Sequence, residues 1–171
     1  MTNETFKIKE SMYAGKGKRF ANYIIDRILV TSLFSAVGIL LGVMAESSGD
    51  YEMLMWLEHI NPVVDYLVTG VLFSLYYIVF ECWTQKTIGK MLTKTIVVDE
   101  NGNKPSVGSI IGRSLCRMIP FNHFSFLGSK GRGWHDSLSK TYVVDVKTQE
   151  EQKQLFESLN KLGEIGEEDF D

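Results

Sequence analysis

A single carboxylate, Asp26, stands at the start of a long uncharged run, Ile28–Ala45. By helical spacing, Asn22 lies four residues before it and Arg19 seven, so the three side chains share one face of a helix. A desolvated carboxylate needs a partner or takes up a proton. Two interpretations therefore stay open. Asp26 either pairs with Arg19 or Arg27 and orients the helix, or it forms an ion or proton site near the mouth of a membrane span.

Further ionisable residues follow later in the chain. Glu81 closes a second apolar run and is the natural counter-charge for Arg27, Arg113 or Arg117. His135 and Asp136 are adjacent, but no nucleophile or cluster of metal ligands accompanies them. The pair therefore does not indicate catalysis by itself.

Other motifs exclude several classes of function. The glycine-rich segment 128–133 lacks the spacing and the strand-to-helix context of a P-loop. The two cysteines, Cys82 and Cys116, are too few for a zinc site. The basic residues lie where membrane anchors are expected, and they do not form a nucleic-acid face. We therefore expect no enzyme, no metal, no cofactor and no nucleic-acid partner.

The elements that position these residues are two apolar helices. All 18 lysines and arginines lie outside the segment Ile28–Gln85, which contains the uncharged runs Ile28–Ala45 and Tyr66–Phe80. A bilayer core of about 30 Å needs roughly 20 apolar helical residues. The sequence therefore predicts an all-α membrane protein built on a helical hairpin, with spans at about residues 20–45 and 63–83. The overall hydrophobic content of 44% and mean hydropathy of −0.02 hide this pattern, because the apolar residues are concentrated in the first half.

The charge pattern predicts the topology of the hairpin. Lysines flank both ends of the hairpin, whereas the connecting segment Glu46–Pro62 is acidic and has no basic residue. This asymmetry places both termini in the cytoplasm of a multi-pass inner-membrane protein, with the connection outside. A cleaved signal peptide is the competing interpretation of the first run. It is disfavoured because the run is long, Asp26 and Arg27 open it, and a second span follows.

Small residues line both expected spans. Gly38 and Gly42 form a GxxxG pair on the first, and Gly70 and Ser74 form a matching stripe on the second. Small residues let helix backbones approach closely in lipid. The stripes predict either packing within the hairpin or a seam between two copies of the chain.

The second half of the chain contains shorter elements. Residues 94–99 and 140–145 have similar β-branched sequences and are expected to pair as a short β-ribbon. Residues 106–119 predict an amphipathic helix, with Ile111 and Leu115 on one face and Arg113 and Arg117 on another. A full third span would place both arginines inside the bilayer, so an interfacial or re-entrant position is expected.

These elements divide the chain into three parts. Residues 1–17 form a polar, flexible N-terminus, and residues 18–146 form the membrane domain. Residues 147–171 form an acidic tail, with eight Asp or Glu against three Lys. The tail has one short amphipathic stretch around Leu155–Leu162 and is otherwise expected to be disordered.

Several short motifs resemble, in order, those of the RDD family of small bacterial membrane proteins, over about residues 16–146. They are Arg19–Asp26, Thr87–Lys90, Pro105-Ser106, Arg113–Arg117 and His135–Val144. The resemblance implies that Arg19, Asp26 and Asp136 are the arginine and two aspartates that give the family its name. It also implies transport of an unidentified ligand, with cation/proton exchange among the suggestions. Many members appear with three spans, whereas the third apolar segment here is broken by Pro120 and Asn122.

The resemblance also brings Asp136 near the helix ends, so we expect it to bond Arg19 or Arg113, with His135 at the same membrane face. Two or three short helices cannot enclose a pathway alone, so a transporter of this size is expected to work as a homo-oligomer or with a partner. Its ligand would be a small molecule, a monovalent cation or a proton. The alternative is an accessory or scaffold subunit of a membrane complex that transports nothing.

Overall fold

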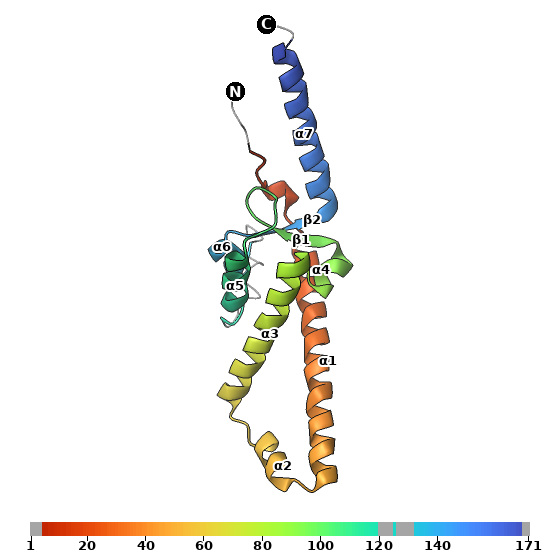
Figure 1. The fold of residues 1–171 in the computed structure, drawn as a ribbon, viewed down its shortest axis with the longest axis vertical. Coiled ribbons are helices and arrows are strands. Elements are labelled where there is room, and N and C mark those ends of the chain that lie inside the picture. Colours follow the sequence, from red (N-terminus) through yellow and green to blue (C-terminus); the bar gives the residue numbers. More distant parts are fainter. Residues whose placement is uncertain (1–4, 120–124, 126–131, 169–171) are drawn as a thin grey trace.

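Two long helices dominate the structure, a computed structural model that describes residues 5–119, 125 and 132–168, with side chains up to residue 162. Helix α1 (Lys16–Ser48) and helix α3 (Pro62–Thr84) form a hairpin joined by the short helix α2 (Tyr51–Glu58). They lie close together at one end and separate toward α2 (Figure 1). The expected spans at about 20–45 and 63–83 lie within these two helices.

Local signals set the ends of the hairpin helices. Helix α1 ends at Gly49, whose φ of 68° lies in the left-handed region that glycine adopts without strain. The Asp50 side chain accepts a hydrogen bond from Met53 N and caps α2. Pro62 opens α3 at a position where no helical N–H is needed, and Asn61 caps it. The connection is therefore a tight turn followed by one short helix.

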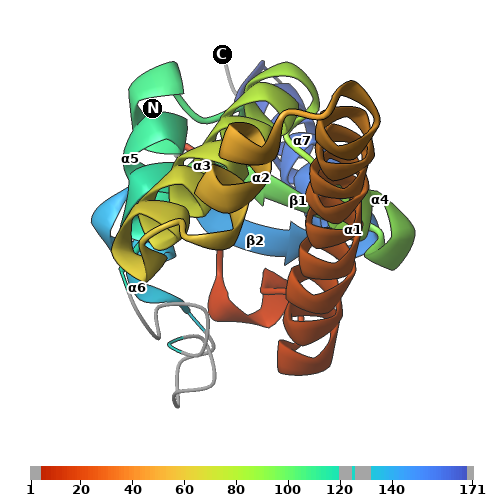
Figure 2. The same cartoon turned by 90° about the horizontal axis from the view of Figure 1, so that it is seen from below.

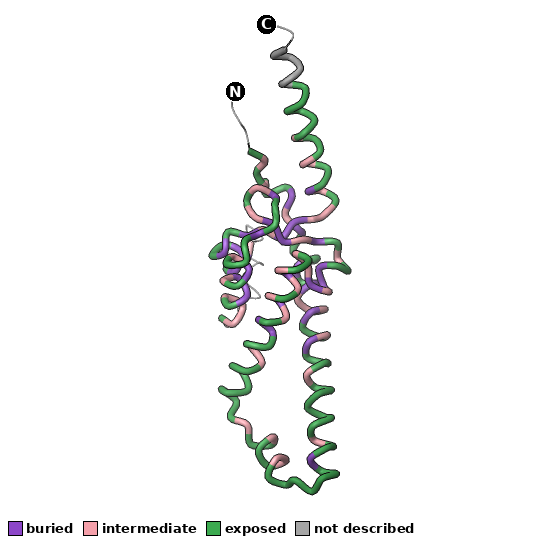
Figure 3. Tube along the Cα trace, in the orientation of Figure 1, coloured by how far each residue is buried: buried purple, intermediate pink, exposed green. Residues whose placement is uncertain are grey.

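Most side chains of the hairpin are not covered by the rest of the chain. Only 11% of the most apolar stretch of α1 and 17% of that of α3 is buried. Figure 3 shows both helices exposed over most of their length, while buried residues gather at the end remote from α2. At 1.5 Å per residue, the 23 residues of α3 extend about 35 Å, enough to cross a bilayer. This surface is suited to lipid and unsuited to water.

The buried end of the hairpin carries a small head, which we define as residues 5–15, 85–119 and 132–145. Its centre is an antiparallel ribbon of β1 (Thr95–Val98) and β2 (Tyr142–Asp145), with Val97 opposite Val143. The predicted β-ribbon is therefore confirmed. Helix α4 (Ile88–Thr93) connects α3 to β1 and packs against α1. Figure 2 shows α4 and α5 on opposite sides of the hairpin, with the ribbon beyond it.

The N-terminal segment packs against this ribbon. After the 3-10 turn η1 (Glu10–Met12), Tyr13 forms a bridge with Val144, and Ala14 N donates to Val143 O at 2.9 Å. Met12 and Ala14 are buried. Residues 5–17, which were expected to belong to a polar, flexible N-terminus, thus place their few apolar side chains in the core of the head.

Helix α5 (Val107–Cys116) lies within the predicted segment 106–119 and packs against α3, and the short helix α6 (Trp134–Leu138) packs against α5. Ile111 and Leu115 are exposed, whereas Arg113 is fully buried. The helix thus turns Arg113 inward together with Ile110, and turns Ile111 and Leu115 outward. Its 10 residues extend about 15 Å, half a bilayer core, so this helix by itself is too short to cross a bilayer.

The acidic tail forms helix α7 (Val146–Glu168), which starts directly after β2 and points away from the head (Figure 1). The tail, which was expected to be partly helical or disordered, is helical well beyond the stretch around Leu155–Leu162. Phe6 stacks edge-on against Phe156 with ring centroids 5.6 Å apart, and Gln149 Nε2 donates to Gly102 O at 2.8 Å. These contacts fasten the first turns of α7 to the head. The predicted fold class, a mostly helical protein with two apolar helices and a two-stranded ribbon, is confirmed.

Candidate functional site

Asp26 is buried where α1 meets the start of α4, and three donors hold its carboxylate. Oδ2 accepts from the Thr87 hydroxyl at 2.6 Å, and Oδ1 accepts from Gly89 N at 2.8 Å and from the Tyr76 hydroxyl at 2.9 Å. Hydrogen bonds of this kind stabilise the ionised form of a carboxylate. Neither expected partner pairs with it, since Arg19 binds Asp136 and the Arg27 guanidinium lies 4.6 Å from the centre of the Phe73 ring.

A glycine makes this contact between helices possible. A Cβ on Gly89 would lie 2.6 Å from the backbone oxygen of Asn22 and 3.0 Å from Asp26 Oδ1. Beside it, the Asn22 amide lies between the hydroxyl groups of Thr93 and Thr95 and bonds both. The backbone of α4 therefore approaches α1 closely enough to present its N–H to the carboxylate.

Asp136 forms the second centre, at the first turn of α6. It pairs with Arg19 and, through Oδ1, with Arg113 NH1 at 2.9 Å, and all three side chains are nearly or fully buried. Gly133 N donates to Oδ2 at 3.2 Å, and His135 Nε2 lies 3.3 Å from Oδ1. One carboxylate thus joins α1, α5 and α6, elements that are far apart in the sequence.

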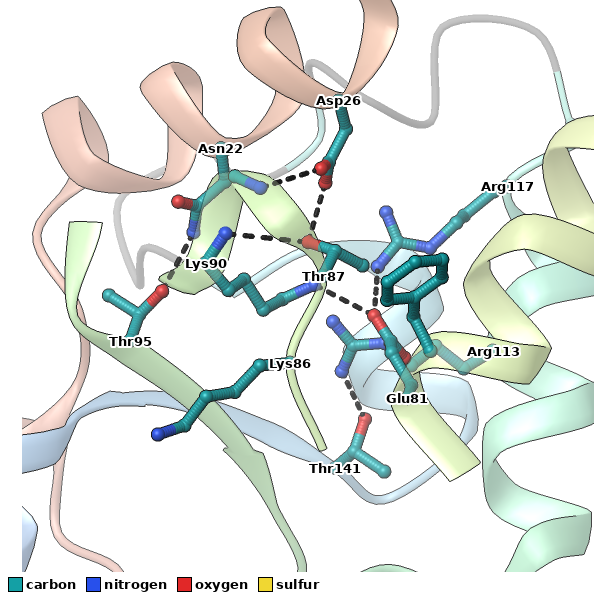
Figure 4. A network of polar contacts seen from close by, with 12 residues as sticks. Asn22, Asp26, Glu81, Lys86, Thr87, Lys90, Thr95, Arg113, Arg117 and Thr141 are labelled. Atoms are coloured by element: carbon teal, nitrogen blue, oxygen red, sulfur yellow. Dashed lines mark hydrogen bonds and ion pairs between the residues drawn. The ribbon is translucent and has the colours of Figure 1, made fainter. Parts of the chain in front are cut away.

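Glu81 forms the third centre, at the last turn of α3. Its Oε1 accepts from Lys90 Nζ at 2.7 Å and from Arg117 NH2 at 3.3 Å, and Arg113 Nε lies 3.1 Å from Oε2 (Figure 4). The Arg117 guanidinium also lies 4.0 Å from the centre of the Tyr77 ring. Because Arg113 contacts both Glu81 and Asp136, the second and third centres form one network.

We call the seven ionised residues of these three centres the charged cluster. Its members are Arg19, Asp26, Glu81, Lys90, Arg113, Arg117 and Asp136. Six of the seven are almost fully buried, and Arg117 retains 20% side-chain exposure. Pairing is what makes such burial tolerable, because removing one partner leaves an uncompensated charge.

The environment shifts several pKa values in the head. Burial lowers the pKa of Lys90 to about 8, opposed by Glu81 and aided by Arg117 and Arg113. Burial also lowers the pKa of His135 well below its usual value, so its ring is neutral at pH 7. Burial opposes ionisation of Asp136, but His135, Arg19 and Arg113 hold its pKa well below the usual range. Lys90 is therefore the group of the cluster poised to change charge near neutral pH.

Two connected spaces adjoin the charged cluster. A cavity of about 40 Å³ lies between Asp26 and the cationic side chains. A groove of about 370 Å³ runs along α3 from Pro62 to Tyr77 beside α1 and the end of α5. The two share lining residues, namely Tyr23, Tyr77, Arg117 and His135. The cavity can hold two or three waters, or one small ion, and the groove adjoins it on the side of the spans.

The structure brings together most residues singled out in the sequence. Arg19, Asn22 and Asp26 share one buried face of α1, as their spacing predicts, and Asp136 binds both arginines that were expected. Glu81, Arg113, Arg117 and His135 lie in or against the charged cluster.

The small-residue stripes do not meet within the hairpin. A Cβ on Gly38 or Gly42 would meet nothing within 4 Å among the described residues. Gly70 instead faces Met118, and the Ser74 hydroxyl donates to Ser114 O at 3.3 Å. The interpretation of the stripes as packing between α1 and α3 is therefore wrong, because the helices separate and α5 occupies the face of α3.

Sequence reasoning missed four members of the site: Tyr76, Thr87, Lys90 and Thr141. Lys90 looks like one of several membrane-anchoring lysines, yet it is 3% exposed and pairs with Glu81. Thr141 accepts a hydrogen bond from Arg113 NH1 at 2.9 Å. The only sequence signal for Thr87 and Lys90 was their place in the Thr87–Lys90 motif. That motif does not indicate which charged side chain is buried.

Metal binding has no support in the described part of the chain. There, no three or more His, Cys, Asp or Glu side chains are arranged to hold a metal ion. No curated protein and no solved structure matches the sequence. The model of the RDD family matches residues 13–140, which include the hairpin, β1 and the whole charged cluster and end just before β2. With most of its length matched and two apolar helices beside a buried cluster, this membrane-associated chain belongs to the RDD family.

Proposed function

We propose that this chain is a multi-pass inner-membrane protein that transports a small ligand or exchanges a cation for protons, and that it is not an enzyme. The observation that carries the proposal is the charged cluster, which encloses a cavity where the two apolar helices meet. Buried ionisable groups at a membrane span are costly and are retained where ions or protons move.

The proposed topology has the head and both termini in the cytoplasm and α2 outside. It is supported by the lysines around the head and by the acidic connection between the spans. The described N-terminal segment and helix α7 also lie at the end of the molecule opposite α2 (Figure 1). In this orientation the charged cluster lies at the cytoplasmic ends of the spans.

The proposed transporter is a homo-oligomer, or it works with a partner protein. Because α1 and α3 separate toward α2, a single copy offers no closed route between them. The open stripe of Gly38 and Gly42 on α1 would allow close approach of another helix. The pathway would then run between chains and reach the cavity through the groove along α3.

Proton exchange at Asp26 would be coupled to the position of α4. A proton on Oδ2 would weaken the hydrogen bond that this oxygen accepts from the Thr87 hydroxyl. Loss of the Thr87 bond would loosen the first turn of α4, next to Lys90. Protonation of Asp26 would therefore cause a movement of α4 at the mouth of the groove.

Flux measurements in liposomes test this proposal. Purified protein is reconstituted with a pH-sensitive dye inside, and a Na⁺ or K⁺ gradient is applied. We expect proton movement with the wild type and with Glu52→Gln, a matched change at an exposed carboxylate on α2. Asp26→Asn keeps the shape but cannot ionise, so exchange should vanish while the protein remains folded. Wild-type protein that moves no ions, or an Asn variant with equal flux, would refute transport.

One observation favours a second candidate, a scaffold subunit. Helix α7 projects from the head with Leu155, Leu159 and Leu162 exposed on one side. In a non-transporting subunit, this face would bind a partner helix. The test is the mass of the complex extracted from membranes. Replacing the three leucines by serine should reduce that mass if the chain is a scaffold, and should leave ion flux unchanged if it is a transporter.

A further inference from the structure

The charges of the buried cluster do not balance. The cluster contains four cations and three carboxylates: Arg19, Lys90, Arg113 and Arg117 against Asp26, Glu81 and Asp136. His135 is buried and neutral and adds no charge. At neutral pH the cluster therefore carries an excess of one positive charge in a setting where unpaired charge is expensive.

The ion pairs described for the cations of the cluster are made with Glu81 and Asp136. Asp145, at the end of β2, pairs with Lys18. Between Ile119 and Arg132 the sequence contains no Asp or Glu. Arg132 itself donates to Asp136 O at 3.2 Å, which adds positive charge at the edge of the cluster. A small anion from outside the polypeptide would balance this excess.

The excess charge is concentrated around the cavity of about 40 Å³. All four cations of the cluster line it, and Asp26 is the one carboxylate among its described lining residues. That carboxylate already accepts three hydrogen bonds. Arg117 Nε is buried and has no hydrogen-bond partner among the described residues. The Arg117 guanidinium, with one buried N–H that lacks a described acceptor beside this space, has the chemistry of an anion site.

We propose that this cavity binds one small monovalent anion of the halide class, with Arg117 and Lys90 as its principal contacts. The space holds two or three waters and admits a bare halide, which accepts hydrogen bonds from any direction. The groove along α3 shares Tyr23, Tyr77, Arg117 and His135 with the cavity and gives the anion a way in. Binding is an equilibrium property of the head and holds whether or not the protein transports ions.

Anion binding and the protonation of Lys90 are linked. The charged groups that face Lys90 are Glu81 on α3, Asp26 on α1, and Arg113 and Arg117 from α5 and its end. Since these groups and burial leave the lysine with a pKa of about 8, its proton is lost above that pH and the charge excess disappears. Affinity for the halide should therefore fall as pH rises from 7 to 9, and a bound halide should raise the pKa of Lys90.

A halide titration in detergent tests the site. Sodium chloride or bromide replaces sodium gluconate at constant ionic strength, and the melting temperature is recorded. We expect a saturable rise with either halide and none with gluconate, which is too large for the cavity. Arg117→Gln should weaken the halide response about tenfold or more, since it removes a charged donor. Arg27→Gln is the matched control, because Arg27 lies over Phe73 and does not line the cavity.

Equal melting of the wild type in chloride and gluconate would overturn the proposal, as would an Arg117→Gln variant with the full response. If that variant does not fold, bromide-soaked crystals of the wild type decide. A bromide peak within contact of Arg117 and Lys90 supports the site, and an empty cavity at saturating bromide refutes it. Absence of flux in liposomes would end the transport proposal but would leave this result unchanged.

Discussion

The pairing of Arg19 with Asp136 makes the sharpest prediction for stability. Arg19→Ala removes one partner of a buried pair, and Asp136→Ala removes a group that also binds Arg113 and Gly133 N. Breaking a buried pair typically costs about 3–5 kcal/mol. We expect Arg19→Ala at the lower end and Asp136→Ala at the upper end, because the second change also leaves Arg113 with one carboxylate fewer.

The two changes should not add. Once Asp136 is absent, replacing Arg19 no longer breaks their pair. The free energy of unfolding lost by the double variant should therefore be about 1–3 kcal/mol smaller than the sum of the two single losses. Thermal melting of the four proteins in one detergent measures this coupling. The control is the same cycle on Lys18 and Asp145, whose side chains are 48% and 22% exposed, where coupling should stay below about 1 kcal/mol. Strict additivity for Arg19 and Asp136 would refute the network.

Three further predictions concern the groups around the cluster. Gly89→Ala should destabilise the protein by about 2 kcal/mol, because its Cβ would lie 2.6 Å from Asn22 O. Gly112→Ala, whose Cβ meets nothing within 4 Å, should be neutral or stabilising in the same melting assay. Glu81→Gln should cost about 3 kcal/mol or more by urea unfolding, since three cations lose their carboxylate, and a loss below about 1 kcal/mol would contradict this account. In gluconate, stability should rise from about pH 8 to pH 10.5, because Lys90 has a pKa of about 8 in the folded chain against 10.5 when unfolded. The unfolded state then binds the extra proton in that window, and the rise should be absent in Lys90→Met.

The hairpin and the ribbon could be predicted because their signals are local. Two uncharged runs framed by lysines are enough to identify α1 and α3, and repeated β-branched segments are enough to identify β1 and β2. The spacing of Arg19, Asn22 and Asp26 likewise predicted one buried face of α1. Patterns of this kind depend on neighbours a few residues apart, which a sequence states directly.

The partners of each charge could not be predicted because they come from distant segments. Asp26 binds residues about sixty positions later, and Asp136 binds a residue more than one hundred positions earlier. Helix α5 shows a second limit. An amphipathic pattern predicts two faces of a helix but does not tell which face is buried. Here Arg113 faces inward because it pairs with the carboxylates of Glu81 and Asp136. The length of the helix in the tail could not be predicted, because composition does not record the contacts of α7 with Phe6 and Gly102.

The proposed function depends on the charged head lying at the cytoplasmic ends of two membrane spans. Side-specific labelling tests this orientation most directly. In a background with Cys82→Ser and Cys116→Ser, single cysteines replace two exposed residues, Asp50 before α2 and Lys104 in the head. Spheroplasts are treated with a membrane-impermeant maleimide before and after permeabilisation. We predict that Asp50→Cys reacts in intact spheroplasts and that Lys104→Cys reacts only after permeabilisation. Labelling of Lys104→Cys in intact spheroplasts, or equal labelling at both positions, would contradict the account.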